Sequence, residues 1–191
     1  FDPLPTGFTY VEPNDLDAVK AALTDTTAAF LLEPIQGEGG VNPMTKEFLE
    51  GLAALAKEKD ILLLLDEVQC GFGRTGDLNG YDTIAPGLVA DGISWAKGMG
   101  GGFPIGSFYV AEKHAPLLGP GSHGSTFGGN PLAARAARAV LETLRDEDLC
   151  SHAGEIGEWL MGALREAFAE TPGVVEVRGR GLMIGIELDR P

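Results

Sequence analysis

Two side chains with acid–base chemistry follow short strand-like runs of the chain. Asp66 comes directly after residues 61–65, and Lys97 comes two residues after 92–95. Ligands of parallel sheets bind beyond the carboxyl ends of the strands, so both side chains are expected at such an edge. A lysine amine forms an imine with an aldehyde, and a carboxylate keeps a pyridine nitrogen protonated. The pair therefore indicates a site for a Schiff-base cofactor.

Simpler interpretations of both residues stay open. Asp66 and Glu67 would also serve as caps that bind backbone amides near the end of a strand. Most lysines are solvated surface groups, but Lys97 is followed by the glycine-rich residues 98–102, beside which a ligand can approach the backbone closely. This neighbourhood favours a functional lysine.

A glycine pattern at residues 71–76 (GFGRTG) matches the GxGxxG sequence of dinucleotide-binding loops and follows a predicted strand. In those loops the last glycine opens a helix. Here Gly80, Pro86 and Gly87 would break any helix that started after it. An NAD-dependent oxidoreductase is therefore disfavoured, and it is kept as the alternative from a different functional class.

A second glycine-rich segment, residues 121–131, places small hydroxyl side chains just before a predicted helix. Asn130 and Pro131 form a strong helix start, an N-cap followed by proline at the first helical position. Hydroxyl groups and free amides before a helix suit an anion or a phosphate. An ordinary capping loop would explain the same residues.

The hydrophobic pattern predicts strands that alternate with helices, and hence an α/β fold with a mostly parallel sheet. Residues 61–65 are apolar without alternation, which is typical of a strand covered on both faces. Asn14 is the expected cap of the first helix. The predicted helices are 16–23, 45–57, 130–145 and 151–170, and the predicted strands are 28–32, 61–65, 92–95, 107–111, 174–177 and 182–188.

The pattern changes near Asp148, from alternating strands and helices to one long helix followed by two strands. We expect a domain boundary there. Residues 1–148 would form part of a large sheet domain, and residues 149–191 the beginning of a small α+β domain.

Composition excludes several classes of partner. The 191 residues contain 14 Lys and Arg against 28 Asp and Glu, a formal net charge of −14, which argues against nucleic-acid binding. No apolar run reaches the ~18 residues of a membrane helix. Cys70 and Cys150 are far apart and the histidines form no cluster, so no metal site is expected. Two free thiols favour a cytoplasmic location.

Five segments together resemble the class III aminotransferases, which are fold-type I enzymes dependent on pyridoxal 5′-phosphate. Their order and spacing are similar to those of the family, and they extend over nearly the whole chain. The resemblance implies part of the family's large domain and the start of its small domain. The segments are 32–40 (LEPIQGEGG), 66–69 with 73–76 (DEVQ and GRTG), 96–106 (AKGMGGGFPIG), 124–132 (GSTFGGNPL) and 177–182 (VRGRGL).

The resemblance also implies roles for individual residues toward the cofactor. Lys97 would form the Schiff base and later move a proton between the substrate and the cofactor, and Asp66 would pair with the pyridinium nitrogen. Glu67 belongs to the same cofactor-binding run. Val68 would pack on the ring, and Gln69 would hydrogen-bond to the phenolic oxygen.

Three further residues would act on the phosphate and the substrate. Thr126 resembles the residue that binds the phosphate of the partner subunit's cofactor, and Ser125 an adjacent substrate contact. Glu38 matches a glutamate of the substrate pocket. The resemblance thus implies a homodimer with shared active sites, an amino donor and a 2-oxo acid.

The expected reaction transfers an amino group from N-acetylornithine to 2-oxoglutarate in arginine biosynthesis, because residues 177–185 and the pair Thr126-Phe127 favour that branch. Ornithine, succinylornithine, diaminobutyrate and 4-aminobutyrate aminotransferases and glutamate-1-semialdehyde aminomutase share every motif and stay open. Since the upstream half and the end of the small domain are absent, we expect a fragment that is inactive alone. Residues 77–91 are longer than the family pattern and have no assigned role.

Overall fold

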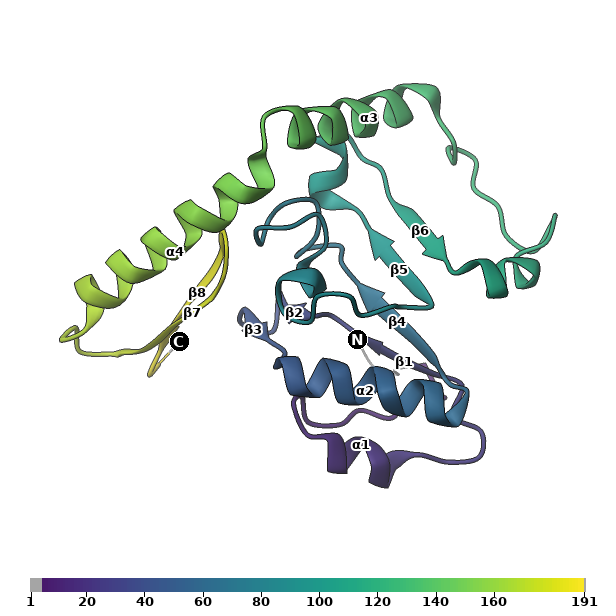
Figure 1. Ribbon diagram of the computed structural model, residues 1–191, viewed down its shortest axis with the longest axis horizontal. Coiled ribbons are helices and arrows are strands. Elements are labelled where there is room, and N and C mark those ends of the chain that lie inside the picture. The colour runs from purple at the N-terminus through teal and green to yellow at the C-terminus, as the bar shows by residue number, and fades with distance from the viewer. Residues whose placement is uncertain (1–4, 191) are drawn as a thin grey trace.

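The computed structural model describes residues 5–190 of the chain (Figure 1). It contains the expected mixture of helices and strands. The α-helices are α1 (Leu16–Ala22), α2 (Lys46–Lys59), α3 (Pro131–Asp146) and α4 (Leu149–Phe168), and the 3-10 helices are η1 (Gly80–Thr83), η2 (Lys97–Gly100) and η3 (Glu112–Leu117). The strands are β1 (Ala29–Leu32), β2 (Ile35–Gln36), β3 (Asn42–Pro43), β4 (Leu62–Asp66), β5 (Gly92–Trp95), β6 (Ser107–Val110), β7 (Val174–Arg180) and β8 (Met183–Leu188).

The central sheet has the strand order β1-β4-β5-β6. β1, β4 and β5 run parallel, and β6 is antiparallel to β5 at the edge. Two small antiparallel pairs, β2 with β3 and β7 with β8, lie outside this sheet. The predicted α/β class with a mostly parallel sheet is confirmed.

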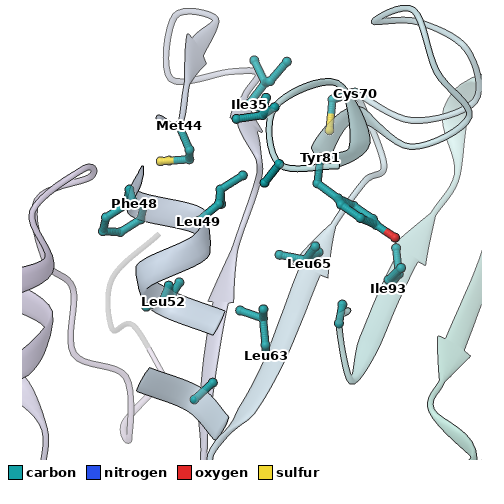
Figure 2. Close-up of a cluster of buried hydrophobic side chains, with 14 of the residues drawn as sticks. Ile35, Met44, Phe48, Leu49, Leu52, Leu63, Leu65, Cys70, Tyr81 and Ile93 are labelled. Carbon is teal, nitrogen blue, oxygen red and sulfur yellow. The ribbon is translucent and has the colours of Figure 1, made fainter. Parts of the chain in front are cut away.

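The main hydrophobic core lies between the sheet and α2, which crosses in front of it in Figure 1. Leu49 and Leu52 of α2 face Leu63 and Leu65 of β4 (Figure 2). These four side chains are at most 3% exposed. Burying a leucine side chain contributes about 1.5–3 kcal/mol, so this layer anchors β4 firmly.

The second face of the sheet is less covered than the sequence predicts. Leu62 and Leu64 of β4 are only half-buried, and Leu31 of β1 is 62% exposed. Within residues 5–190, β4 therefore alternates between a fully buried face and a partly open one. The expectation that this strand is covered on both faces is not met by the described part of the chain.

The first helix begins differently from the prediction. Asp15, not Asn14, is the N-cap of α1, and its carboxylate accepts a hydrogen bond from Ala18 N at 2.8 Å. Asn14 adopts a left-handed φ of 63° and its Oδ1 accepts from Thr45 N at 2.8 Å. The Asn14 side chain thus forms a long-range hydrogen bond to the start of α2, whereas local capping rules predict that it caps α1.

The later elements match their predictions closely. Asn130 caps α3 by accepting hydrogen bonds from Leu132 N and Ala133 N. α3 leads directly into α4, and β7 and β8 form a hairpin beside α4, seen on the left of Figure 1. The connection at residues 147–148 coincides with the expected domain boundary, which stays a prediction.

The backbone of α4 is in direct contact with the backbone of the turn between β7 and β8. A Cβ atom at Gly157 of α4 would lie 2.2 Å from the carbonyl oxygen of Gly181, in the turn between β7 and β8. A Cβ atom at Gly181 would in turn lie 2.5 Å from the carbonyl carbon of Thr75. The successive contacts of α4, the hairpin turn and Thr75 therefore leave no room for a side chain at either glycine.

Candidate active site

Asp66 and Lys97 lie at the carboxyl ends of two neighbouring parallel strands. Asp66 is the last residue of β4 and pairs in register with Ser94 of β5, three residues before Lys97. The Glu67 N–H extends this ladder by donating to Ser94 O at 2.9 Å. The structure therefore brings the two residues to one edge of the sheet, where ligands of such sheets bind.

The Asp66 carboxylate is half-buried and partly engaged. Its Oδ1 accepts a hydrogen bond from Val68 N at 2.9 Å, which closes a tight turn after the strand. Among residues 5–190 its Oδ2 receives no hydrogen bond, so one oxygen is held in place and the other is available. Both the capping role and a role toward a ligand are compatible with this geometry.

Lys97 has a strained backbone. It opens η2 with a φ of 44°, in the left-handed region that costs a non-glycine residue of order 1–3 kcal/mol. Its side chain is exposed and forms no ion pair or hydrogen bond with the described residues. η2 packs on α3, and a Cβ atom at Gly101 would lie 3.0 Å from Val140 of that helix. α3 thus holds the turn that presents the lysine.

Gln69 and Glu38 meet although 31 residues separate them. Gln69 Nε2 donates a hydrogen bond to Glu38 Oε1 at 3.2 Å. The missing side chain of Gly37 makes this possible, because a Cβ atom there would lie 1.6 Å from Gln69 Oε1. Sequence reasoning overlooked Gly37, and its only signal was the glycine-rich segment that follows β2.

Glu67 makes structural contacts and is 1% exposed. Its two carboxylate oxygens accept hydrogen bonds from Gly80 N at 2.7 Å, Tyr81 N at 2.9 Å and Cys70 Sγ at 3.2 Å. Burial raises the pKa of Glu67 above its ordinary value, while the bonds to the two amides oppose that rise. Its predicted part in cofactor binding stays a prediction, since the contacts shown here brace η1.

Burial has a similar effect on two neighbours of Glu67. The pKa of the Cys70 thiol is raised by desolvation and by the adjacent Glu67 charge. The pKa of Tyr81 is raised to about 12, mainly by burial. Cys70 and Tyr81 are thus protonated core residues at neutral pH.

The unusual segment 77–91 connects the two strand ends that carry the site. Besides the bonds from η1 to Glu67, Asn79 Oδ1 accepts a hydrogen bond from Trp95 Nε1 at 3.1 Å. Glu67 follows Asp66 directly, and Trp95 comes two residues before Lys97. Asn79 and η1 therefore hold both strand ends, a role that no sequence signal indicated.

The segment 71–76 forms turns instead of a dinucleotide-binding loop. Gly71 N donates to Glu67 O at 3.0 Å and Gly73 N donates to Asp77 O at 3.1 Å. Between this segment and β5, the described residues form only the 3-10 helix η1, at Gly80–Thr83. The glycine pattern thus lacks the α-helix whose N-terminus would bind a pyrophosphate.

Ser125 and Thr126 lie in a different segment from the other predicted site residues. Both are exposed, in the loop between η3 and α3, and neither side chain hydrogen-bonds to Asp66, Lys97 or Gln69. The neighbouring Phe127 is 80% exposed. Six of the eight predicted site residues thus lie at the end of β4 or in the segments that follow β2, β4 and β5, and these two lie in the loop before α3.

Metal-binding clusters and membrane-spanning helices are both absent from residues 5–190. In this range no three His, Cys, Asp or Glu side chains gather as a potential metal site. No helix within the same residues is long and apolar enough to cross a membrane. Cys70 and Cys150 are both free, the first buried and the second half-buried.

Comparison with known proteins gives one consistent result. Residues 9–191 match the family model "Aminotransferase class-III". The acetylornithine aminotransferase of Myxococcus xanthus is 49% identical over 191 residues, 99% of this chain and 47% of its own length. That of Gloeobacter violaceus is 50% identical over 194 residues, 100% of this chain and 47% of its own.

A solved structure of another aminotransferase has a similar fold. The ornithine aminotransferase of Toxoplasma gondii superposes with a TM-score of 0.93 at 38% identity, over 99% of this chain and 45% of that one. The chain thus spans about half the length of the proteins it matches. The fold-type I architecture expected from the sequence is confirmed.

Proposed function

The chain belongs to the class III aminotransferase family, and on this premise we propose that it contributes to a pyridoxal 5′-phosphate-dependent transfer of an amino group from N-acetylornithine to 2-oxoglutarate. One observation carries the proposal: a lysine amine without a partner among residues 5–190 and a half-buried carboxylate lie at the carboxyl ends of neighbouring parallel strands. The choice of substrate rests on the relatives, because several proteins named acetylornithine aminotransferase are 47–50% identical to the chain.

The residues at the strand ends fit this cofactor. The Lys97 amine is unpaired among the described residues, and Asp66 Oδ2 is free to hold a proton on a pyridine nitrogen. Val68 and Gln69 come two and three residues after Asp66, and they offer an apolar surface for a ring and an amide donor for a phenolic oxygen. The cofactor would supply an aldehyde and a ring that accepts electrons from the substrate carbon.

Within that reaction, each side chain has a distinct task. Lys97 binds the cofactor and then moves a proton at its Nζ atom. Asp66 stabilises positive charge on the ring nitrogen, and the bond from Val68 N fixes its orientation. Glu38, hydrogen-bonded to Gln69, faces the substrate.

The substrate assignment has one runner-up. The structural neighbour from Toxoplasma gondii is named an ornithine aminotransferase, and the 45% of it that this chain matches has nearly the same fold. The higher identity to acetylornithine aminotransferases favours N-acetylornithine, and ornithine is the second candidate.

The same proposal includes the assembly and the location. We infer a cytoplasmic homodimer with shared active sites, in which Thr126 binds the phosphate of the partner's cofactor and Ser125 contacts substrate. The exposure of both side chains and of Phe127 supports this assignment. The small domain would begin at residue 149, where α4 starts.

The test uses the full-length protein. Addition of pyridoxal 5′-phosphate should produce the visible absorbance of a bound cofactor, and N-acetylornithine should be converted at least tenfold more efficiently than ornithine. Absence of both signals would reject the function, and a preference for ornithine would select the second candidate. A hydride transfer with NAD would instead favour the oxidoreductase alternative.

A further inference from the structure

Arg178 joins the β7–β8 hairpin to the loop that carries Glu38. Its side chain is 18% exposed and donates hydrogen bonds to two backbone carbonyls 137 and 138 residues away in sequence. Nη2 and Nε lie 2.8 and 3.1 Å from Gly40 O, and Nε lies 3.2 Å from Val41 O. The planar fork of a guanidinium matches such paired acceptors.

Two carboxylates fix the other side of the guanidinium. Nη1 pairs with Glu176 Oε2 at 3.0 Å on β7 and with Glu187 Oε2 on β8. Both glutamates belong to the hairpin, so the charge of Arg178 is balanced on its own element. The hydrogen bonds from Arg178 to the carbonyls of Gly40 and Val41 are therefore specific contacts, and they do not result from a general electrostatic attraction.

The loop that Arg178 holds is strained. Val41 has a φ of 55°, which is unusual for a β-branched residue, and Gly40 has a φ of 110°. The N–H groups of both residues donate to Gly37 O, at 3.2 and 3.1 Å. Such a turn persists only where its surroundings stabilise it.

The hairpin also restrains the loop by close packing. A Cβ atom at Gly185 would lie 3.0 Å from Val41 Cβ and 3.2 Å from Gly40 O. The second strand of the hairpin thus approaches the same two loop residues that Arg178 binds. The two contacts together fix the position of the loop.

We propose that Arg178 is a positioning residue for the substrate side of the site, holding loop 37–41 so that Glu38 stays hydrogen-bonded to Gln69. This inference rests on the proposed function, in which Glu38 faces the substrate and Gln69 the cofactor. Arg178 touches neither ligand and acts only through the loop. The hairpin thereby controls the geometry of a site at the edge of the sheet.

The first test needs no enzymatic reaction. In the full-length protein without cofactor, Arg178→Met should accelerate amide hydrogen exchange at Gly40 and Val41 about tenfold or more. Arg165→Met is the matched control, because Arg165 Nε donates to Val177 O in the same hairpin and does not reach the loop. Unchanged exchange at Gly40 and Val41 in Arg178→Met would overturn the inference.

The second test asks whether Arg178 acts through Glu38. Arg178→Met should lower kcat/KM about tenfold, mainly by raising KM, since small displacements of binding groups reduce rates strongly. In a Glu38→Ala background the same substitution should change kcat/KM less than twofold. Equal losses in both backgrounds would contradict the proposed route.

A third variant guards against misfolding. Arg178→Lys retains the charge between the two glutamates but lacks the planar fork that binds both carbonyls. It replaces the methionine variant in both tests if that variant fails to fold. A wild-type enzyme without transaminase activity would reject the proposed function only. The hydrogen-exchange result would still decide whether Arg178 holds the loop.

Discussion

The strand ends and the loop before α3 were assigned to one site, yet they are built in different ways. Asp66 ends β4 and Lys97 follows β5, and this chain supplies the register, core contacts and hydrogen bonds of both strands. Residues 121–129 are exposed throughout, and Phe127 is 80% exposed. The first region is defined by its own chain, and the second has little around it to define its position.

Because of this difference, we expect the strand ends to determine the rate of the reaction and the loop to determine the affinity for the cofactor. A group that moves a proton must be held within a fraction of an ångström, which a packed sheet and a strained turn provide. A group that binds a phosphate acts at longer range, and a second subunit can supply it. We therefore expect changes at the strand ends to affect the reaction, and changes in the loop to affect cofactor binding.

The largest effect is expected for Lys97→Ala in the full-length enzyme. Loss of the amine should abolish the borohydride-reducible covalent link between protein and cofactor and lower kcat by several powers of ten. Lys57→Ala, on the exposed side of α2, is the control and should keep both. Covalent attachment of labelled cofactor to the Lys97→Ala variant would show that another residue holds it.

Asp66→Asn should have the next largest effect. The asparagine oxygen can still accept the hydrogen bond from Val68 N, so the turn and the fold should persist. Loss of the charge should slow proton abstraction from the substrate by several powers of ten, at about 1.4 kcal/mol for each power. Turnover near that of the wild type would reduce Asp66 to a strand cap.

Thr126→Ala should weaken cofactor binding without changing the chemistry. One lost hydrogen bond to a dianion is worth about 1.5–3 kcal/mol, or roughly ten- to a hundredfold in affinity. Titration with the cofactor measures this change.

A mixed dimer locates the defect. One subunit carries Lys97→Ala and the other Thr126→Ala. If Thr126 acts across the interface, both defects fall on the site of the Lys97→Ala subunit and the other site keeps wild-type affinity. If no wild-type site survives, Thr126 acts within its own chain and the shared-site assignment is wrong.

The smallest effect is expected for Glu67→Gln, and it concerns stability. In this variant an amide nitrogen replaces one of the two carboxylate oxygens and cannot accept that oxygen's bond from Gly80 N or Tyr81 N, so the free energy of unfolding should fall by about 1–3 kcal/mol. Glu58→Gln, exposed on α2, should change it by less than about 0.5 kcal/mol. Denaturant titration of both variants measures the difference.

The pH dependence of that difference is a separate check. Burial raises the folded-state pKa of Glu67 above the ordinary 4.5 of the unfolded chain, so folding favours the protonated form. Its stabilising contribution is complete below pH 4.5 and declines as the pH rises through the raised value. The advantage of the wild type over Glu67→Gln should therefore shrink across that window, and an advantage that grows would contradict the shifted pKa.

The sequence predicted the strand ends well because local patterns determine them. A short apolar run followed by Asp66, and a strand followed by Lys97 and glycines, are visible without a partner segment. The cap of α1 was wrong because Asn14 bonds to Thr45, a contact 31 residues away. Asn79 and Arg178 escaped notice for the same reason, since both act on residues that are distant in sequence.

The contact of Gly157 with the backbone of Gly181, and of Gly181 with the backbone of Thr75, has a consequence for mutational scanning. A selection for growth would find both glycines as intolerant as Lys97, because any added methyl group collides with main-chain atoms. A profile of tolerated substitutions would thus not distinguish this contact between α4 and the hairpin turn from residues that take part in the reaction. Purified variants would separate the two cases: a glycine variant should lose folded yield, whereas Lys97→Ala should remain abundant and inert.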